Sequence, residues 1–467
     1  MQFKQRITEL VDSKSNQFME INDKIWEFAE IRFQEHKSAN LQMELLEKEG
    51  FKVEKNLGGM DTAFSGSFGE GKPVIGLLGE FDALSDLSQV ADQTTKEAII
   101  EDGSGHGCGH HTLGTSSLAS AVALKDYMEE HNIKGTVRYY GCPAEESGGG
   151  KTFMVRDGHF EDVDLALTWH PSSVNCVLGS GFLANVKVLY DFEGVSSHAA
   201  ASPELGRSAL DALELMNIGV NFLREHMIDE ARIHYAITDA GGNAPNVVQA
   251  KSQVFYTIRA PKSPQVQDLF KRVNDIAKGA ALMTGTKVVT RVTAGYSDYL
   301  ANDTLSDMMK SHARDVISDI AYTDEEHTYA KQFQTTLDAE LKAMQNMMNL
   351  SNEVMSQPIM NGLAPSPRKL PGSSDVGDVS WVVPMAQFMG NCYAFGTPAH
   401  SWQMVAQGKS SITHKGMVAA AKVMALTAAE VLENPAIIEK IKEDHVKVLD
   451  GNEYICPLPE NSIPNLI

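Results

Sequence analysis

The chain of 467 residues is poor in basic residues, in cysteine and in long apolar runs. Its 40 Lys and Arg residues face 61 Asp and Glu residues, and the formal net charge of −21 argues against neutralising nucleic-acid phosphates. The five cysteines are odd in number and widely spread, which favours reduced thiols in a cytoplasmic protein over a disulfide framework. The most apolar segment, at 416–432, is broken by Lys422 and too short for a membrane span, and the charged amphipathic start predicts no secretory signal. We therefore expect a cytoplasmic protein that binds neither nucleic acid nor membranes.

Strand and helix patterns divide the chain into two units, as its length suggests. Residues 1–182 alternate apolar strands with helices, which indicates an α/β fold with a mostly parallel sheet flanked by helices. Residues 183–296 follow the order β-α-β-β-α-β, typical of a compact α+β unit inserted into the first. Residues 297–467 would complete the first unit. Their polar helical stretch contains four methionines that fit gap-filling core better than a cofactor site, Met344, Met347, Met348 and Met355.

A loop rich in glycine and histidine, GHGCGHHTLG at positions 105–114, is the first candidate site. Cys108 and His110 flank one glycine, and Gly107 and Gly109 allow the sharp turn that would bring the thiol and the imidazole together. Such a pair is typical of zinc ligands, and Mn or Co would also accept a set of histidines and carboxylates. On this loop alone, a mobile segment with an incidental cysteine is an equal alternative. A catalytic thiol paired with its base is a third.

Two adjacent carboxylates, Glu145 and Glu146, follow the predicted strand in GTVRYYGCPAEE. Because neighbouring residues at a strand end point in different directions, one carboxylate can bind metal while the other faces substrate. Their mutual repulsion raises the pKa of one of them toward a value useful to a general base. Taken alone, the pair also fits a solvated acidic turn. The GGGKT that follows is not a phosphate-binding loop, because position 145 would have to be glycine.

Two single histidines, His170 and His400, end apolar segments in ALTWHPSS and FGTPAHSWQ. Each alone fits a structural histidine, but the carboxyl ends of parallel strands meet at one edge of a sheet. Together with Cys108, His110 and Glu146 they supply five donors from four segments. That set is enough for two divalent metal ions about 3.5–4 Å apart that share a water. Hydroxide formed from this water, with Glu145 as the general base, would attack an amide carbonyl.

Seven motifs also follow the order found in one enzyme family: GHGCGHH, GCPAEESGGGKTFMVRDG, LTWHPS, GVSSHAAASPELGRSALDA, GGNAPNVVQA, SSDVGDVSW and GTPAHSWQ. Over nearly its whole length the chain resembles the M20 metallopeptidases, in particular their amidohydrolase branch, subfamily D, and its aminobenzoyl-glutamate utilisation group. The resemblance implies a catalytic domain formed by residues 1–182 and 297–467, interrupted by a lid and dimerisation domain at 183–296. It also implies two divalent metal ions, Mn or Zn, with Co as an alternative. The substrate would be an N-acyl amino acid or a dipeptide-like amide, with p-aminobenzoyl-glutamate the first candidate.

The resemblance also implies a role for each motif residue. Glu145 matches the general base, and the matching metal ligands are Cys108, His110, Glu146, His170 and His400. Asp82 in GEFDAL lies at the acidic strand end near the metals and is implied to orient a ligand. His198 in GVSSHAA matches a lid histidine that reaches the partner subunit's site and stabilises the oxyanion.

Further matches concern the substrate and one departure from the family pattern. Arg232, Arg259 and Asn246 of the lid would hold a substrate carboxylate, for which a guanidinium is suited by its bidentate geometry. Solvated strand arginines are the alternative. His111 stands where relatives commonly have Asp or Asn. It would orient a ligand, coordinate metal itself or weaken the affinity for metal.

Three functions are therefore compared. A metal-dependent amidohydrolase is favoured, a non-hydrolytic binding or regulatory member of the same fold is the second, and a Cys-His nucleophilic hydrolase, which needs Cys108 unligated, is the third. We expect a homodimer formed through the lid, because the placement of His198 in the partner's site requires one. A hetero-oligomer with a related A-type subunit is the alternative.

Overall fold

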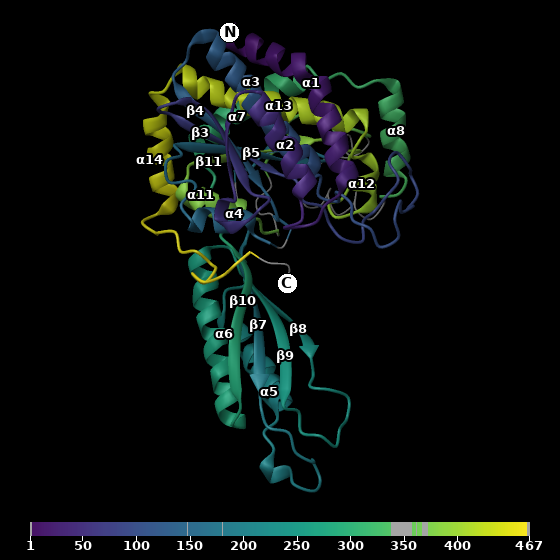
Figure 1. Ribbon diagram of the computed structural model, residues 1–467, viewed down its shortest axis with the longest axis vertical. Helices are drawn as coiled ribbons and strands as arrows, with labels where there is room; N and C mark the ends of the chain where they lie inside the picture. The colour runs from purple at the N-terminus through teal and green to yellow at the C-terminus, as the bar shows by residue number, and fades with distance from the viewer. Residues whose placement is uncertain are drawn as a thin grey trace.

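The computed structural model describes residues 2–146, 148–179, 181–337, 357–360, 362–366 and 372–464. A seven-stranded sheet lies among helices, and a four-stranded sheet with two helices projects from this body (Figure 1). The chain enters the projecting unit through β7 (Ala184–Glu193) and returns through β10 (Lys287–Tyr296). The projecting unit is thus inserted between two parts of the chain that build the larger one.

The seven-stranded sheet is parallel at its centre and antiparallel at its edges, in the order β1-β2-β4-β3-β5-β11-β6. The parallel strands are β4 (Gly135–Cys142), β3 (Val74–Glu80), β5 (Leu165–Ser172) and β11 (Met385–Asn391). The antiparallel pairs involve β1 (Lys52–Lys55), β2 (Phe64–Glu70) and β6 (Cys176–Val177). The prediction of a mostly parallel sheet is therefore wrong at the edges, and the sheet is mixed. The edge strands are joined by short connections without a crossover helix, which reverse the chain direction.

Helices cover both faces of this sheet. One face carries α1 (Gln2–Phe28), α2 (His36–Lys48), α3 (His110–His131), α7 (Asp303–Ser318) and α13 (Ser411–Glu433). The other carries α4 (Gly150–Arg156) and α11 (Val376–Val382). Because neighbouring strand residues point to opposite faces, Leu77 lies in the first core and Leu78 in the second. α14 (Ile437–Leu449) packs beside α7, and α12 (Trp402–Gln407) precedes α13.

The four-stranded sheet is antiparallel throughout, in the order β10-β7-β9-β8. Its other elements are α5 (Ala209–Leu223), β8 (Arg232–Asp239), β9 (Lys251–Ala260) and α6 (Ser263–Thr284). This is the predicted β-α-β-β-α-β order. Alternate residues such as Val188 and Tyr256 form a separate core with α5 and α6. Residues in the other register, such as Lys187 and Phe255, therefore face away from the two helices.

Two remaining expectations concern composition. α8 (Asp324–Gln334) opens the Met-rich stretch, but Met344, Met347, Met348 and Met355 lie outside the described residues. All five cysteines fall within the described part of the chain, and all are free thiols. Among the described residues, no helix has both the length and the apolar character needed to cross a membrane.

Candidate metal centre

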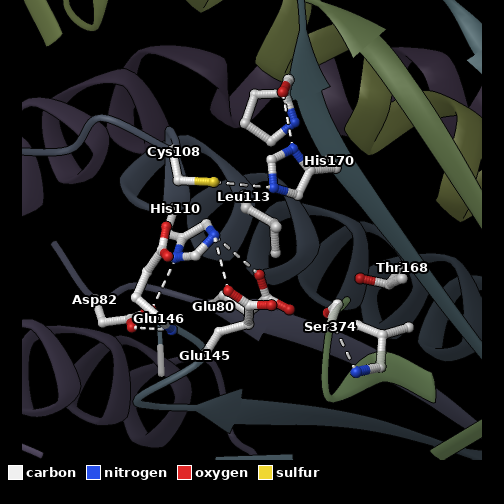
Figure 2. Close-up of polar contacts among 12 residues, drawn as sticks. Glu80, Asp82, Cys108, His110, Leu113, Glu145, Glu146, Thr168, His170 and Ser374 are labelled. Carbon is white, nitrogen blue, oxygen red and sulfur yellow. Dashed lines mark hydrogen bonds and ion pairs between the residues drawn. The ribbon is translucent and has the colours of Figure 1, made fainter. Parts of the chain in front are cut away.

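The candidate ligands converge at the carboxyl edge of the parallel strands. Asp82 follows β3, Glu145 and Glu146 follow β4, and His170 lies near the end of β5. His400 comes from the loop after β11, and the loop with Cys108 leads into α3. Side chains from segments far apart in the sequence therefore surround one space, as Figure 2 shows for those it labels.

The glycine-rich loop makes the sharp turn that its sequence requires. Gly109 adopts a left-handed conformation with φ 75°, and a Cβ there would collide with the Tyr393 hydroxyl and the Pro171 ring. This turn places Cys108 before α3 and His110 in its first turn. The backbone amide of His400, itself left-handed, donates to the Gly107 carbonyl at 2.7 Å and so ties the two ligand loops together.

Potential ligand atoms fall into three groups, within each of which all atoms lie within 4.8 Å of one another. The groups are Cys108 with His110 and His170, Cys108 with Glu146 and His400, and Glu80 with His110 and Glu145. The thiol of Cys108 belongs to two groups and lies 3.4 Å from His170 Nε2. His400 Nε2 lies 3.1 Å from Glu146 Oε1. All five predicted ligands are thus brought together around a shared sulfur.

Asp82 holds two of these residues in place. Its Oδ1 lies 2.8 Å from His110 Nδ1, and its Oδ2 accepts a hydrogen bond of 2.8 Å from the Glu146 amide (Figure 2). The contact at Nδ1 leaves His110 Nε2 facing the centre. A carboxylate on the far nitrogen of a histidine fixes the orientation of the ring and raises its basicity. Asp82 therefore has the geometry expected of a residue that orients a ligand.

Charges around the centre shift the ionisable groups strongly. Burial raises the pKa of the Cys108 thiol well above its usual value, and Glu146 adds to this effect. Burial opposes a charge on His110, but Cys108, Asp82 and Glu80 outweigh it and raise the pKa of His110. The hydrogen bond from His400 keeps the pKa of Glu146 below its usual value, although burial opposes this, and the same bond raises the pKa of His400.

Glu145 lies beside the ligands without joining the two groups that share Cys108. Its Oε2 is 3.9 Å from His110 Nε2. Burial and then the nearby carboxylates Glu80 and Glu146 raise its pKa well above the usual value. Adjacent residues thus take different environments, because Glu146 pairs with His400 whereas Glu145 has other carboxylates as neighbours.

A buried ion-pair network next to the centre was missed from the sequence. Lys151 is fully buried, and its Nζ lies 2.5 Å from Asp375 Oδ1 and 2.8 Å from Glu80 Oε1. The other Glu80 oxygen lies 3.2 Å from His110 Nε2. In the sequence, Glu80 ends an apolar strand two residues before Asp82, which was a usable signal, whereas Lys151 stood out only within the rejected phosphate-loop pattern.

His111 does not join the ligand groups. It is fully buried, its Nε2 lies 2.9 Å from the Gly408 carbonyl, and its ring packs on His106 at a centroid distance of 4.7 Å. Burial and the neighbouring His106 lower its pKa well below the usual value. These contacts give His111 a role that was not considered from the sequence, packing of the loop against the segment around Gly408.

The donor set fits divalent cations. His110 Nε2 and Glu146 Oε1 are buried, and each lies beside a charged group, Glu80 Oε2 at 3.2 Å and His400 Nε2 at 3.1 Å. Burying charged groups so close together is costly, and coordination to a cation would offset that cost. One thiol, three imidazoles and one carboxylate match the ligand preferences of Zn, and of Mn or Co for the histidines and the carboxylate.

The four residues predicted in the inserted unit occupy its two ends. His198 pairs with Val247 in an isolated bridge, and the Ala199 amide donates to the Asn246 carbonyl at 2.9 Å. Both predicted residues are exposed in loops beyond the strand ends far from the larger unit (Figure 1). Arg232 and Arg259 face each other across β8 and β9 near the junction with the larger unit. Eight residues of β9 precede Arg259. At the usual rise of an extended chain, this corresponds to about 26 Å between Arg259 and the start of that strand.

Comparison with known proteins matches this architecture. The model of peptidase family M20/M25/M40 matches residues 76–430. The B-type subunit of the p-aminobenzoyl-glutamate hydrolase of Escherichia coli (strain K12) is 44% identical over 480 residues, which cover 98% of each chain. The A-type subunit of that hydrolase, from the same organism, is 29% identical over 250 residues, 50% of this chain and 56% of that protein.

Among solved structures, the Bacillus subtilis YXEP protein, a dinuclear metal binding peptidase from the M20 family, shares the fold. The TM-score is 0.58 at 16% identity, with 90% of this chain and 99% of that chain covered. The family match, the full-length relative and the shared fold all agree with the cluster of thiol, imidazole and carboxylate groups at the edge of the sheet. The chain belongs to peptidase family M20/M25/M40 and is a hydrolase of amide bonds.

Proposed function

We propose that the protein is a two-metal amidohydrolase that cleaves the amide of an N-acyl amino acid or a dipeptide-like substrate, with p-aminobenzoyl-glutamate the first candidate. The observation that carries the proposal is the Cys108 thiol, which belongs to two ligand groups with Glu145 beside them. The substrate candidate comes from the name of the Escherichia coli relative, which aligns with this chain from end to end.

The two ions would share Cys108, with His110 and His170 completing one site and Glu146 and His400 the other. Mn or Zn fits this set, and Co is an alternative. Bound cations supply Lewis-acid polarisation of the amide carbonyl and lower the pKa of water. Asp82 keeps His110 and Glu146 in position through its two oxygens.

Glu145 is proposed as the general base. It accepts a proton from the attacking water and returns it to the leaving amine, so one carboxylate serves both halves of the reaction. Support comes from its place next to Glu146 but outside the Cys108 groups, with its Oε2 directed toward the His110 side of the centre. The third hypothesis, in which Cys108 is a nucleophile, is disfavoured because its sulfur is enclosed by ligand-type atoms.

Residues 1–182 and 297–467 would form the catalytic domain, and residues 183–296 a lid that also dimerises. His198 lies beyond the far end of β7, whereas Lys187 near the start of that strand is influenced by Glu145 and Glu146. His198 therefore serves a second copy of the chain better than its own centre. There it would stabilise the oxyanion. An obligate monomer with full activity would exclude this role.

The carboxylate-binding residues divide in the same way. Arg259 and its neighbour Arg232 lie near the junction with the catalytic domain, so they would serve the centre of their own chain. Asn246 accompanies His198 and would act with it in the partner. A guanidinium matches a carboxylate in bidentate geometry. Because the relative is named as one of two types of hydrolase subunit, an assembly with an A-type subunit is the alternative to a homodimer.

A liquid-chromatography screen tests the proposal. The Mn-loaded protein is incubated with N-acyl and aminobenzoyl amino acids, and release of the free amino acid is followed. We expect p-aminobenzoyl-glutamate to be cleaved faster than neutral N-acyl amino acids. Binding without cleavage after loading with Mn, Co and Zn in turn would favour the non-hydrolytic alternative.

A further inference from the structure

A cavity of about 380 Å³ lies between the open face of the four-stranded sheet and the edge of the larger unit. All four strands of the sheet line it, with Lys187 and Phe255 among the contributing residues. From the larger unit come Arg32, Phe33 and Gly148. Gly148 lies three residues after Glu145, so the cavity begins beside the proposed catalytic centre.

Lys187 brings a positive charge into this cavity. The side chain is half-buried, and no hydrogen bond or ion pair joins its Nζ to another described residue. Burial and the like charges of Arg259 and Arg32 lower its pKa. Glu145 and Glu146 are the opposite charges that influence it, and neither lies within ion-pair distance. A half-buried ammonium without a paired acid is a site that an anionic ligand would stabilise.

The segment with Arg32 and Phe33 is fixed against the catalytic centre. The Glu30 carbonyl accepts from the Ala83 amide at 2.8 Å, and Glu35 Oε1 accepts from the Ala144 amide at 2.8 Å. Between these anchors Phe33 has φ 60°, a left-handed conformation that is unusual for a bulky residue. Such strain persists only where surrounding contacts enforce it, and it is concentrated at ligand sites.

The aromatic side chain of Phe33 depends on the glycine at position 148. A Cβ at Gly148 would lie 2.6 Å from Ala144 Cβ and 2.9 Å from Phe33 Cζ, so the ring occupies part of the space that any other residue would fill. Phe255 adds a second ring from β9, and Leu189 an aliphatic side chain from β7. The cavity therefore combines positive charge with apolar side chains, beside the polar residues Thr238, Gln253 and Thr293, which suits a carboxylate on a short aliphatic chain.

We propose that this cavity binds the side-chain carboxylate of an N-acyl dicarboxylic amino acid, with Lys187 and Arg32 as the specificity-determining residues. The inference rests on the proposed function, in which Arg259 holds the main-chain carboxylate. Arg259 and Lys187 occupy adjacent strands, because Arg259 pairs with Asn185 two residues before Lys187. A glutamyl group would thus span both cations, and a neutral amino acid would leave Lys187 without a partner.

The test compares p-aminobenzoyl-glutamate with p-aminobenzoyl-glutamine, in which a neutral carboxamide of nearly the same shape replaces the side-chain carboxylate. For Lys187→Met we expect KM for the glutamate substrate to rise at least about tenfold with kcat nearly unchanged, since a charge-assisted contact is lost from binding. KM for the glutamine substrate stays within about twofold of wild type. Lys187→Arg keeps the charge and most of the preference for glutamate.

The control is Lys287→Met, which removes an exposed lysine at the far end of the same sheet and leaves both KM values unchanged. An equal loss on both substrates, or an unchanged glutamate-to-glutamine ratio in Lys187→Met, would overturn the subsite.

Calorimetry with N-benzyl-glutamate and N-benzyl-glutamine separates this inference from the proposed function, because neither ligand has an amide to cleave at that position. Wild type should bind the glutamate ligand at least about tenfold more tightly, and Lys187→Met should lose that preference. If wild type cleaves neither substrate but shows this pattern, the substrate proposal fails and the subsite stands. Equal binding of the two ligands by wild type refutes the subsite, whatever is hydrolysed.

Discussion

Removing the positive charge of Lys151 should destabilise the protein strongly. Its ammonium is fully buried between Asp375 and Glu80, at 2.5 and 2.8 Å. Lys151→Met keeps the length and most of the volume of the side chain, so little cavity is created. Both carboxylates would then remain buried without their counter-ion, with Glu145 as a further acidic neighbour.

The magnitude follows from the cost of an uncompensated buried charge. Breaking a buried ion pair by removing one partner typically costs about 3–5 kcal/mol, and two acids are affected here. Adding Glu80→Gln to Lys151→Met removes one of these unpaired charges, so the double variant should recover part of the loss. An exposed pair gives the reference: Lys310 lies 3.0 Å from Asp307 on α7, and Lys310→Met should cost less than about 1 kcal/mol.

Urea unfolding of chelator-treated protein, followed by circular dichroism, measures these differences without a contribution from bound metal. A chain whose two units have separate cores need not unfold in one step, so the transition of the larger unit is compared between variants. The reasoning is refuted if Lys151→Met unfolds within about 1 kcal/mol of wild type. It is also refuted if the double variant recovers none of the free energy of unfolding and Glu80→Gln instead adds its own full loss to that of Lys151→Met.

Two further predictions address the ligand set and the pH dependence of stability. Cys108→Ala should retain fewer than two metal ions per chain after loading and gel filtration, as measured by mass spectrometry. Cys142→Ala is the control, because Cys142 is a buried thiol outside the ligand groups, and this variant should retain both ions. Unchanged metal content in Cys108→Ala would remove Cys108 from the set of ligands. Burial lowers the pKa of His445, whose Nε2 lies 2.9 Å from the Ser380 carbonyl. The unfolded chain therefore takes up a proton on His445 that the folded chain resists, and stability falls as pH drops through the ordinary histidine pKa of about 6.5. His445→Gln should show a smaller drop in melting temperature between pH 7.5 and 5.5 than wild type, and an identical drop would contradict this account.

The convergence of the candidate ligands could be predicted from the sequence because each follows an apolar strand or a glycine-rich turn. The carboxyl ends of parallel strands lie at one edge of the sheet whatever the details of packing. The positions of Glu146 and His170 at that edge could therefore be predicted without knowledge of side-chain contacts. Glu80 was missed because its role depends on Lys151 and Asp375, which come from a helix start and a loop much later in the chain. Apart from the place of Glu80 at the end of an apolar strand, this network has no local signal in the sequence.

The arrangement of the inserted unit was predictable in order but not in space. The pattern of strands and helices predicted the elements from β7 to β10 in the correct order. It did not predict that Arg259 and His198 lie far apart in space. Their separation depends on strand direction, which places the two at opposite ends of the sheet. The antiparallel pairing at the edges of the larger sheet was not predicted for a related reason, because tertiary packing decides with which strand a short strand pairs.

The most direct test of the central claim is the Glu145→Gln variant, with metal content and turnover of p-aminobenzoyl-glutamate measured on the same preparation. If Glu145 moves the proton while Cys108, His110, Glu146, His170 and His400 hold two ions, the variant keeps both ions. Its kcat then falls by about 10²–10⁴-fold, the usual contribution of a general base. Near-normal kcat would contradict the account, and loss of metal would show that Glu145 is a ligand instead.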